Sequence, residues 1–448
     1  MDDRFAGFPR RRVIWGQYFM SFSWSLGLWA AVPVVPILSL QLNENIALAG
    51  LVVSIGGAGR FFVSYITGAM LDRFGRRGVG AIGIFIRMVF SFLEGISPTY
   101  FALVAFRFGS GIGTSIWGTA HQTITADVST AEDRGRISGR KQGWAQFGAI
   151  VGPVVGGAAW AITGDIRVPF FINGFSKMAC LIVMLFIMVE TRHLSARTAP
   201  AQAVSPEPAR TVTHPAMLRG AGYLSRFYIR VGMAAVRLGG APSAIPSMAA
   251  TGLLYALIGM FAVNLMRATV QDLTLPVYVE DVLGLAKSHL GIVIAAMGVG
   301  GLVTSVAGGW ATDRWGVQTA LVPGALAAAA GLALTAQGPG LVGIVLLAAV
   351  LGGAAGLVMV GTQAFSIDVS PPGARGRFFG QTHAAGHLAV FLGPFAVGGV
   401  ADIYGLETAF YVIGAVFLLM APVGVLMGIV GPRVRARYEQ EAAAAQVS

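Results

Sequence analysis

The residues best suited to chemistry in this sequence are charged side chains that interrupt long apolar stretches. Asp272 lies in the stretch A-T-V-Q-D-L-T-L-P of a helix predicted over 249–279. A carboxyl group in such a place binds and releases a proton at an energetic cost, which suits coupling or substrate binding. Arg267 lies about 140° away around an α-helix, so the two are not expected to form an ideal pair. The alternative is that Asp272 lies near the outer mouth and only balances an arginine.

Three arginines, Arg60, Arg87 and Arg107, also fall within predicted spans. Charges inside a membrane are rare, and they usually face the protein interior or a water-filled path. Such basic groups would suit an anionic substrate. The alternative is that Arg107, and likewise Lys177, extends its charged tip to the membrane interface. Glu94, near the outer end of its helix, is a weaker carboxylate candidate.

Aromatic residues take the place of an acid in the first predicted helix. Tyr18, Phe22 and Trp29 recur there at helical spacing and are candidates to line an apolar cavity. The alternatives are packing in the core or a belt at the membrane interface. His383 and His387 lie four apart without a Glu or Cys beside them, so packing, gate hydrogen bonding or proton relay is favoured over metal binding.

The composition indicates an integral membrane protein. Of 448 residues 55% are hydrophobic and only 11% charged, and the mean hydropathy is +0.71. A soluble domain carries about a quarter charged residues. The net charge of +11 is explained by basic cytoplasmic loops, so no nucleic-acid partner is expected. No P-loop, dinucleotide-binding fingerprint, nucleophile elbow or zinc motif occurs, so we expect neither an enzyme nor a cofactor or metal.

Twelve apolar segments are long enough to cross a bilayer. They cover residues 13–40, 46–70, 79–97, 99–125, 138–163, 168–190, 249–279, 287–311, 318–337, 341–365, 378–402 and 407–430. With the N-terminus in the cytoplasm, 24 of the 31 Lys and Arg residues fall on the cytoplasmic side, five within spans, and only Arg167 and Lys287 outside. This asymmetry predicts an even number of spans and two cytoplasmic termini.

The sequence contains an internal repeat with an offset of 241 residues. Residues 68–77 read G-A-M-L-D-R-F-G-R-R, and residues 309–316 read G-W-A-T-D-R-W-G. The pairs at this offset are Asp72 with Asp313, Asp127 with Asp368, Arg134 with Arg375, and Gly152 and Pro153 with Gly393 and Pro394. Two parallel copies of six helices suit a transporter whose binding site lies between them.

The repeat predicts four regions. These are an N-terminal six-helix bundle over 1–190, a cytoplasmic linker over 191–247, a C-terminal six-helix bundle over 248–432 and a cytoplasmic tail over 433–448.

Three motifs resemble the major facilitator superfamily. The segment 68–77 is similar to its G-x-x-x-D-R-x-G-R-R loop signature, and R-F-G-S-G-I-G at Arg107 resembles its fourth-helix motif. G-A-I-V-G-P-V-V-G-G over 148–157 is similar to a fifth-helix motif associated with drug:proton antiporters. The resemblance implies an inner gate latch around the first motif, a role for Arg107 in proton transfer, and antiport.

The latch would hold the inner gate shut and break when the two halves rock. Asp72 is expected to pair with Arg134 or Arg136, or to accept hydrogen bonds from a helix terminus. The alternative is that these charges merely anchor the loop. Asp313 and Arg314 lack a following Arg pair, so a weaker latch is expected there. The remaining candidate gate residues are Gly68, Arg73, Gly75, Arg76 and Arg77.

Small residues and a proline are expected to give the helix over 138–163 a tightly packed, kinked face. Small residues let helices approach closely, and proline removes a backbone hydrogen bond. Close packing on a neighbour in the other half, as a hinge that prevents leakage, is expected. The residues concerned are Gly148, Gly152, Pro153, Gly156 and Gly157.

We therefore expect an all-α integral membrane protein with twelve transmembrane helices in two pseudo-symmetric bundles, present as a monomer in a bacterial inner membrane. The expected function is secondary transport by rocker-switch alternating access, with proton-coupled export of a small amphipathic organic compound. The alternatives are uptake or facilitated transport of a nutrient or organic anion, and a scaffold or sensor that does not transport. The expected partners are the substrate, protons and the bilayer.

Overall fold

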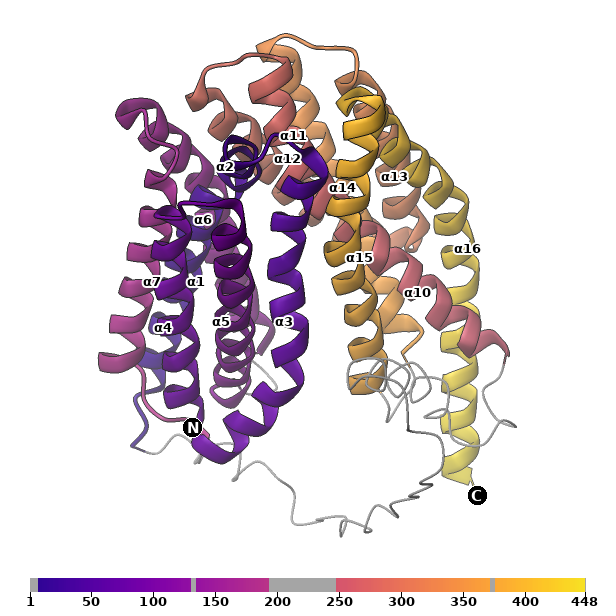
Figure 1. Ribbon diagram of the computed structural model, residues 1–448. Helices are drawn as coiled ribbons and strands as arrows, with labels where there is room; N and C mark the ends of the chain where they lie inside the picture. The colour runs from indigo at the N-terminus through magenta and orange to yellow at the C-terminus, as the bar shows by residue number, and fades with distance from the viewer. Residues whose placement is uncertain (1–6, 130–133, 193–246, 371–374, 448) are drawn as a thin grey trace, which may run out of the picture.

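The computed structural model describes residues 7–129, 134–192, 247–370 and 375–447, and all regular structure in these ranges is helical (Figure 1). In the first half the elements are α1 (Arg10–Ala31), the 3₁₀ turn η2 (Val32–Val34), α2 (Val35–Leu42), α3 (Ile46–Phe74), α4 (Arg76–Gly95), α5 (Tyr100–Asp127), α6 (Arg134–Thr163) and α7 (Val168–Phe186). In the second half they are α10 (Ser247–Met266), the π-helical stretch η3 (Arg267–Thr274), α11 (Leu275–Val277), the π-helical stretch η4 (Tyr278–Val282), α12 (Lys287–Trp315), α13 (Gln318–Thr335), α14 (Leu341–Asp368), α15 (Arg375–Tyr404) and α16 (Leu406–Val447).

These elements form the twelve predicted spans, if α1 to α2 and α10 to η4 each count as one. Ten of the described helices are long and apolar enough to cross a membrane, and Ile46–Arg60 of α3 is a shorter apolar helix. The remaining helix, α5, is less hydrophobic because it contains Arg107 and many Gly, Ser and Thr residues. The predicted fold class is confirmed, and the chain is a multi-pass membrane protein.

The structure repeats at the offset found in the sequence. The helices α3, α5 and α6 begin and end 241 residues before α12, α14 and α15, respectively. Gly75 and Gly316, which end α3 and α12, both have φ of 90°, where a side chain would be strained. The same offset therefore places the same backbone turn in both halves.

Several helix ends differ from the prediction. The predicted tail is largely helical, because α16 continues to Val447 rather than ending near residue 430. The helix predicted over 168–190 ends at Phe186, which frees Glu190 for contacts described below. Most of the predicted linker, 193–246, lies outside the described residues.

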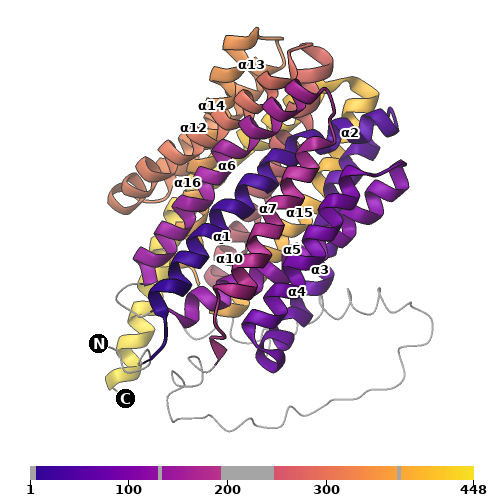
Figure 2. The same cartoon turned by 90° about the vertical axis from the view of Figure 1, so that its left-hand side faces the viewer.

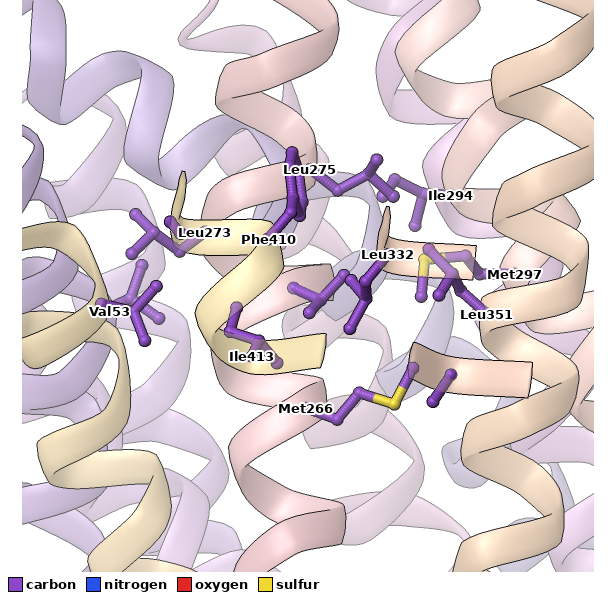
Figure 3. Packing of buried hydrophobic residues seen from close by; sticks show 14 of the residues in the cluster. Val53, Met266, Leu273, Leu275, Ile294, Met297, Leu332, Leu351, Phe410 and Ile413 are labelled. Atoms are coloured by element: carbon purple, nitrogen blue, oxygen red, sulfur yellow. The ribbon is translucent and has the colours of Figure 1, made fainter. Parts of the chain in front are cut away.

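The halves diverge toward the end of the bundle where α1 begins and converge at the opposite end (Figure 1), and the view turned by 90° shows that α16 ends on the same side as α1 begins (Figure 2). We call the end where α1 begins and α16 ends the terminal end, and the opposite one the distal end. Buried apolar side chains form a core that continues across the second half, where Phe410 and Met266 are among those packed together (Figure 3).

In the described residues the halves meet chiefly along two helix pairs, α3 with α15 and α6 with α12. A Cβ added to Gly50 of α3 would lie 2.2 Å from the carbonyl oxygen of Pro394, and one added to Gly291 of α12 would lie 2.3 Å from that of Pro153. Only glycine allows such an approach of two backbones. The two prolines belong to the repeated Gly-Pro pairs, so the motif lies at both contacts between the halves.

The glycines of α6 pack differently from the prediction. Cβ atoms added to Gly148, Gly152 and Gly156 would collide with backbone oxygens of α1 in the same half, whereas Gly157 faces Gly291 of α12. Glycines four apart lie on one side of a helix, and α1 occupies that side. Close packing on the other half is therefore carried by Gly157 and Pro153, and the three other glycines hold α6 against α1.

Candidate functional site

A pocket between the two halves gathers most of the charged residues that the sequence places within spans. Residues of α1, η2, α3, α4 and α5 form one side, and residues of η3 and α15 form the other. The lining residues are Leu28, Trp29, Val32, Val53, Gly56, Arg60, Arg87, Arg107, Ser110, Gly111, Thr114, Arg267, Asp272 and Val390.

Two of the arginines share one carboxylate. The guanidinium groups of Arg87 and Arg107 lie 3.2 Å and 3.7 Å from the same carboxylate oxygen of Glu94. Glu94 is fully buried and Arg107 is 9% exposed. Arg107 therefore lies in the pocket wall rather than at the interface. Glu94, which the sequence indicated only as a weaker candidate, is the shared partner of both arginines.

Arg267 and Asp272 form a long ion pair, although an α-helix would place them on different sides. A guanidinium nitrogen of Arg267 lies 4.0 Å from a carboxylate oxygen of Asp272. Both belong to η3, which is π-helical. A π-helix bonds residues five apart, so they lie on one side rather than about 140° apart as in an α-helix. Such stretches are frequent at functional sites.

Arg60 stands where the halves meet. Its Nε donates to the carbonyl oxygen of Gly56 at 3.2 Å on its own helix, α3. Arg267 and Asp272 of the other half line the same pocket as Arg60. The four arginines of the pocket thus face two carboxylates, Glu94 and Asp272, each with one buried oxygen that has no hydrogen-bond partner among the described residues.

The aromatic residues of α1 separate into two groups. Trp29 lines the pocket. Phe22 stacks on Phe147 of α6 with ring centroids 5.5 Å apart, and Tyr18 is buried with its ring edge-on to Trp15. Phe22 and Tyr18 therefore pack within the first half, and only Trp29 of the predicted stripe faces the pocket.

Lys177 does not reach the membrane interface. Its Nζ is buried, donates to the carbonyl oxygen of Trp24 at 2.7 Å and lies 4.4 Å from the ring centroid of that residue. The cation–π contact and the hydrogen bond hold the amine inside the first bundle.

A second charged cluster lies at the terminal end of the first half. Nε of Arg76 lies 3.2 Å from a carboxylate oxygen of Asp127, and the hydroxyl of Thr191 donates to the same oxygen at 2.8 Å. The side chain of Arg77 donates to the carbonyl oxygens of Met184 and Leu185. Thr191, at the start of the predicted linker, is thus bonded to the end of α5, and Arg76 and Arg77 join the start of α4 to the ends of α5 and α7.

The carboxylate of Glu190 binds the N-terminus of α4. It accepts the backbone N–H groups of Arg76 at 2.9 Å and Arg77 at 3.1 Å, and also those of Thr191 and Arg192. Burial alone would raise the pKa of the Glu190 carboxyl, but the four N–H donors outweigh it and lower this pKa. A carboxylate at a helix N-terminus also complements the helix dipole.

The Glu190 contact predicts a pH-dependent stability. Because the folded protein lowers its pKa, the charged form stabilises the fold above the ordinary Glu pKa of about 4.3, and this contribution is lost as the pH falls through the folded value. We expect Glu190→Gln to cost about 1 kcal/mol near neutral pH, as other capping changes do. The measurement is the thermal unfolding midpoint in detergent at a series of pH values.

The control for this variant is Glu44→Gln, at an exposed site by the start of α3. Wild type and Glu190→Gln should converge in acid, while Glu44→Gln should follow wild type throughout. A difference between wild type and Glu190→Gln that persists unchanged below the pKa of the folded carboxyl would show that the charge is not the cause.

The remaining gate candidates are placed in part. Arg73 is exposed and lies 5.4 Å from the ring centroid of Phe74, and Asp313 and Arg314 are exposed at the end of α12. The side chains of Asp72, Arg134 and Arg136, the surroundings of Gly68 and the side chain of His383 lie outside the described residues.

Sequence reasoning missed the acids that the structure brings to the terminal end. Asp127 pairs with Arg76, and its repeat partner Asp368 lies 3.7 Å from Arg435 of α16. Their recurrence at the offset of 241 was the signal that could have identified them. The partners differ because the position equivalent to Arg76 is Val317.

Comparison with known proteins connects this arrangement to transporters. The family model described as Major Facilitator Superfamily matches residues 18–266 and 256–446. Multidrug resistance protein 1 of Bacillus subtilis (strain 168) is 28% identical over 182 residues, which are 40% of this chain and 46% of the relative. The class C tetracycline resistance protein of Escherichia coli is 27% identical over 185 residues, 41% of this chain and 46% of the relative. The chain thus spans about half the length of the curated relatives it matches.

Solved structures share the fold over nearly the whole chain. A bacterial homologue of the human lysosomal transporter Spinster, inward-facing and unoccupied, matches with a TM-score of 0.68 and 13% identity over 96% of this chain and 98% of its own. The nucleoside transporter NupG matches with a TM-score of 0.67 and 14% identity over 93% and 98%.

Proposed function

The chain belongs to the major facilitator superfamily, and from that premise we propose that it carries a small amphipathic organic anion by alternating access between its two halves. The observation that carries this proposal is that Arg60, Arg87, Arg107 and Arg267 line one pocket together with Asp272. Family members are membrane transporters and not enzymes, so a pocket between the halves is a place for a substrate to pass rather than to react.

The pocket favours an anion because guanidinium groups bind carboxylates and phosphates in a planar, bidentate manner. Its apolar wall, which includes Leu28, Trp29 and Val53, suits the apolar part of an amphipathic compound. A cationic compound would have to approach four positive charges in a setting of low dielectric, where like-charge repulsion is strong.

Asp272 is the carboxylate that we propose to bind and release the coupling proton. It is buried, it lines the pocket, and its ion pair with Arg267 at 4.0 Å is long enough for a substrate to compete for the arginine. Protonation would remove the attraction between the two side chains and raise the net charge of the pocket by one, so binding of the proton and binding of an anion influence each other.

Export in exchange for protons is the direction we propose first. It is supported by the Gly-Pro motif of α6, which lies at the contact between the halves, and by relatives named as multidrug and tetracycline resistance proteins. Uptake together with a proton is the second candidate. The pocket favours it because a proton on Asp272 and an anion on the arginines attract each other and would bind together.

The same proposal includes the orientation of the chain in the membrane and the gate elements of its first half. We place both termini in the cytoplasm of a bacterial cell, with the chain as a monomer in the inner membrane, since 24 of its basic residues then lie in cytoplasmic segments. The contacts of Arg76 with Asp127 and of Glu190 with the start of α4 would hold the gate elements of the first half in one arrangement.

Flux measurements in proteoliposomes test the proposal. One aromatic skeleton carrying a carboxylate, an amide or an amine is offered under a pH gradient imposed in either direction. We expect the carboxylate alone to move. Movement of the anion against the proton flow supports export, and movement with it supports uptake. Transport of the amine without the carboxylate would overturn the anion assignment.

A further inference from the structure

We propose that the pocket binds a doubly charged anion, such as a dicarboxylate. Glu94 is the positioning residue that determines which ligand charge the pocket prefers. The inference rests on the proposed organic-anion transport and specifies its substrate class. It comes from the way the carboxylates divide the four arginines into two pairs.

The first pair is held by Glu94. One of its carboxylate oxygens contacts Arg87 at 3.2 Å and Arg107 at 3.7 Å, and its other oxygen has no hydrogen-bond partner in the part of the chain that the structure describes. Both arginines line the pocket, whereas Glu94, fully buried, is not among the lining residues. Two guanidinium groups repel each other at this range, so the shared carboxylate is what keeps them side by side. A ligand therefore meets two arginines whose net charge with Glu94 is +1.

The second pair consists of Arg60 and Arg267, with Asp272 as its carboxylate. Arg60 comes from the first half and Arg267 from the second, both line the pocket with Asp272, and Asp272 lies 4.0 Å from Arg267. With Asp272 ionised, this pair also carries a net charge of +1. The four guanidinium groups and two carboxylates together leave +2.

An uncompensated charge of +2 in a buried pocket is unfavourable unless a ligand neutralises it. A singly charged ligand leaves one positive charge uncompensated, and a triply charged one brings an excess negative charge. A ligand with two separated anionic groups can neutralise both arginine pairs at once. Each anionic group can accept hydrogen bonds from N–H donors that are already in place. Within the described ranges the buried Nε atoms of Arg87 and Arg107 have no hydrogen-bond partner, so donors remain at the first pair.

Glu94→Gln tests the role of this residue because it preserves size and removes one negative charge. The pocket then carries +3. We expect the preferred ligand charge to rise by one, which a purely structural role for Glu94 would not produce. Glu94→Asp keeps the charge and is the matched control.

The experiment measures binding to the purified full-length protein in detergent by titration calorimetry. The probes share a benzene ring: benzoate carries one carboxylate, while phthalate, isophthalate and terephthalate carry two at three separations, and benzene-1,3,5-tricarboxylate carries three. In wild type we expect at least one dicarboxylate to bind about tenfold more tightly than benzoate or the tricarboxylate, a difference of about 1.4 kcal/mol. In Glu94→Gln the tricarboxylate should become the tightest ligand, and Glu94→Asp should keep the wild-type order.

The outcomes separate this inference from the proposed function. If benzoate binds wild type as tightly as the dicarboxylates, or if no dicarboxylate binds at millimolar concentration, the double charge is overturned, while flux of other organic anions would still uphold the proposed function. If Glu94→Gln keeps the wild-type order, Glu94 does not set the charge. If Glu94→Gln does not fold, the wild-type series still decides the charge, and an altered order in Glu94→Asp would overturn the role of Glu94.

Discussion

Replacing Asp272 with asparagine is expected to abolish the response of transport to a pH gradient while exchange of labelled for unlabelled substrate continues. The amide has the shape of the carboxyl group but takes up no proton, so a pH gradient can no longer drive the binding and release of a proton at this site. It also removes a negative charge from a pocket that already contains four arginines, so an anion should bind at least as tightly as in wild type. Gradient-driven flux should fall by about tenfold or more, in line with the usual contribution of a proton-transfer group.

The measurement compares flux with and without an imposed pH gradient in proteoliposomes that contain equal amounts of folded protein. Asp165→Asn is the matched control, because Asp165 is exposed in the turn before α7. A variant Asp272→Asn that still responds to the gradient like wild type would show that another group carries the proton.

Replacing Arg267 with glutamine is expected to weaken binding of the transported anion by about 10- to 100-fold, because a hydrogen bond to a charged group contributes about 1.5–3 kcal/mol. Arg267 lines the pocket and is the partner of Asp272, so the variant also leaves a buried carboxylate without its counter-charge. Its effect should therefore exceed that of losing a contact with the ligand alone.

The two contributions are separated by a second variant. Arg267→Gln combined with Asp272→Asn removes both charges, so it should recover the stability lost in the single variant but not the affinity for the anion. Arg433→Gln, at an exposed position of α16, is the control for the loss of an arginine as such. Recovery of affinity in the double variant would show that Arg267 acts only as the partner of Asp272.

Much of the fold could be predicted because membrane spans and repeats leave strong signals in sequence. Apolar length defines the spans, and the offset of 241 residues that links Asp72 to Asp313 also links the bounds of α3 to those of α12. Arg107 and Asp272 could be identified as candidates because charges are conspicuous in an apolar helix. That both face one pocket could not be read from either helix alone.

The pairings of these charges were beyond sequence reasoning for two physical reasons. The pair Arg267 and Asp272 depends on π-helical backbone in η3, and a calculation of angles that assumes an α-helix separates them. The contact between Glu94 and Arg107 depends on how α4 packs against α5. Glu190 was missed because its helix was predicted to continue through it, whereas in the structure the carboxylate binds the first N–H groups of α4.

The two halves are copies, yet their first helices are distorted in opposite ways at the pocket. In the first half the backbone tightens into the 3₁₀ turn η2, just after Trp29, and in the second half it widens into the π-helical η3, which carries Arg267 and Asp272. In a symmetric carrier both halves would line the pocket with the same side chains, and a guest could bind in either of two opposite orientations. Here the first helix of one half contributes Leu28, Trp29 and Val32 to the pocket, and the first helix of the other contributes Arg267 and Asp272, so a guest meets different side chains at equivalent positions of the two halves.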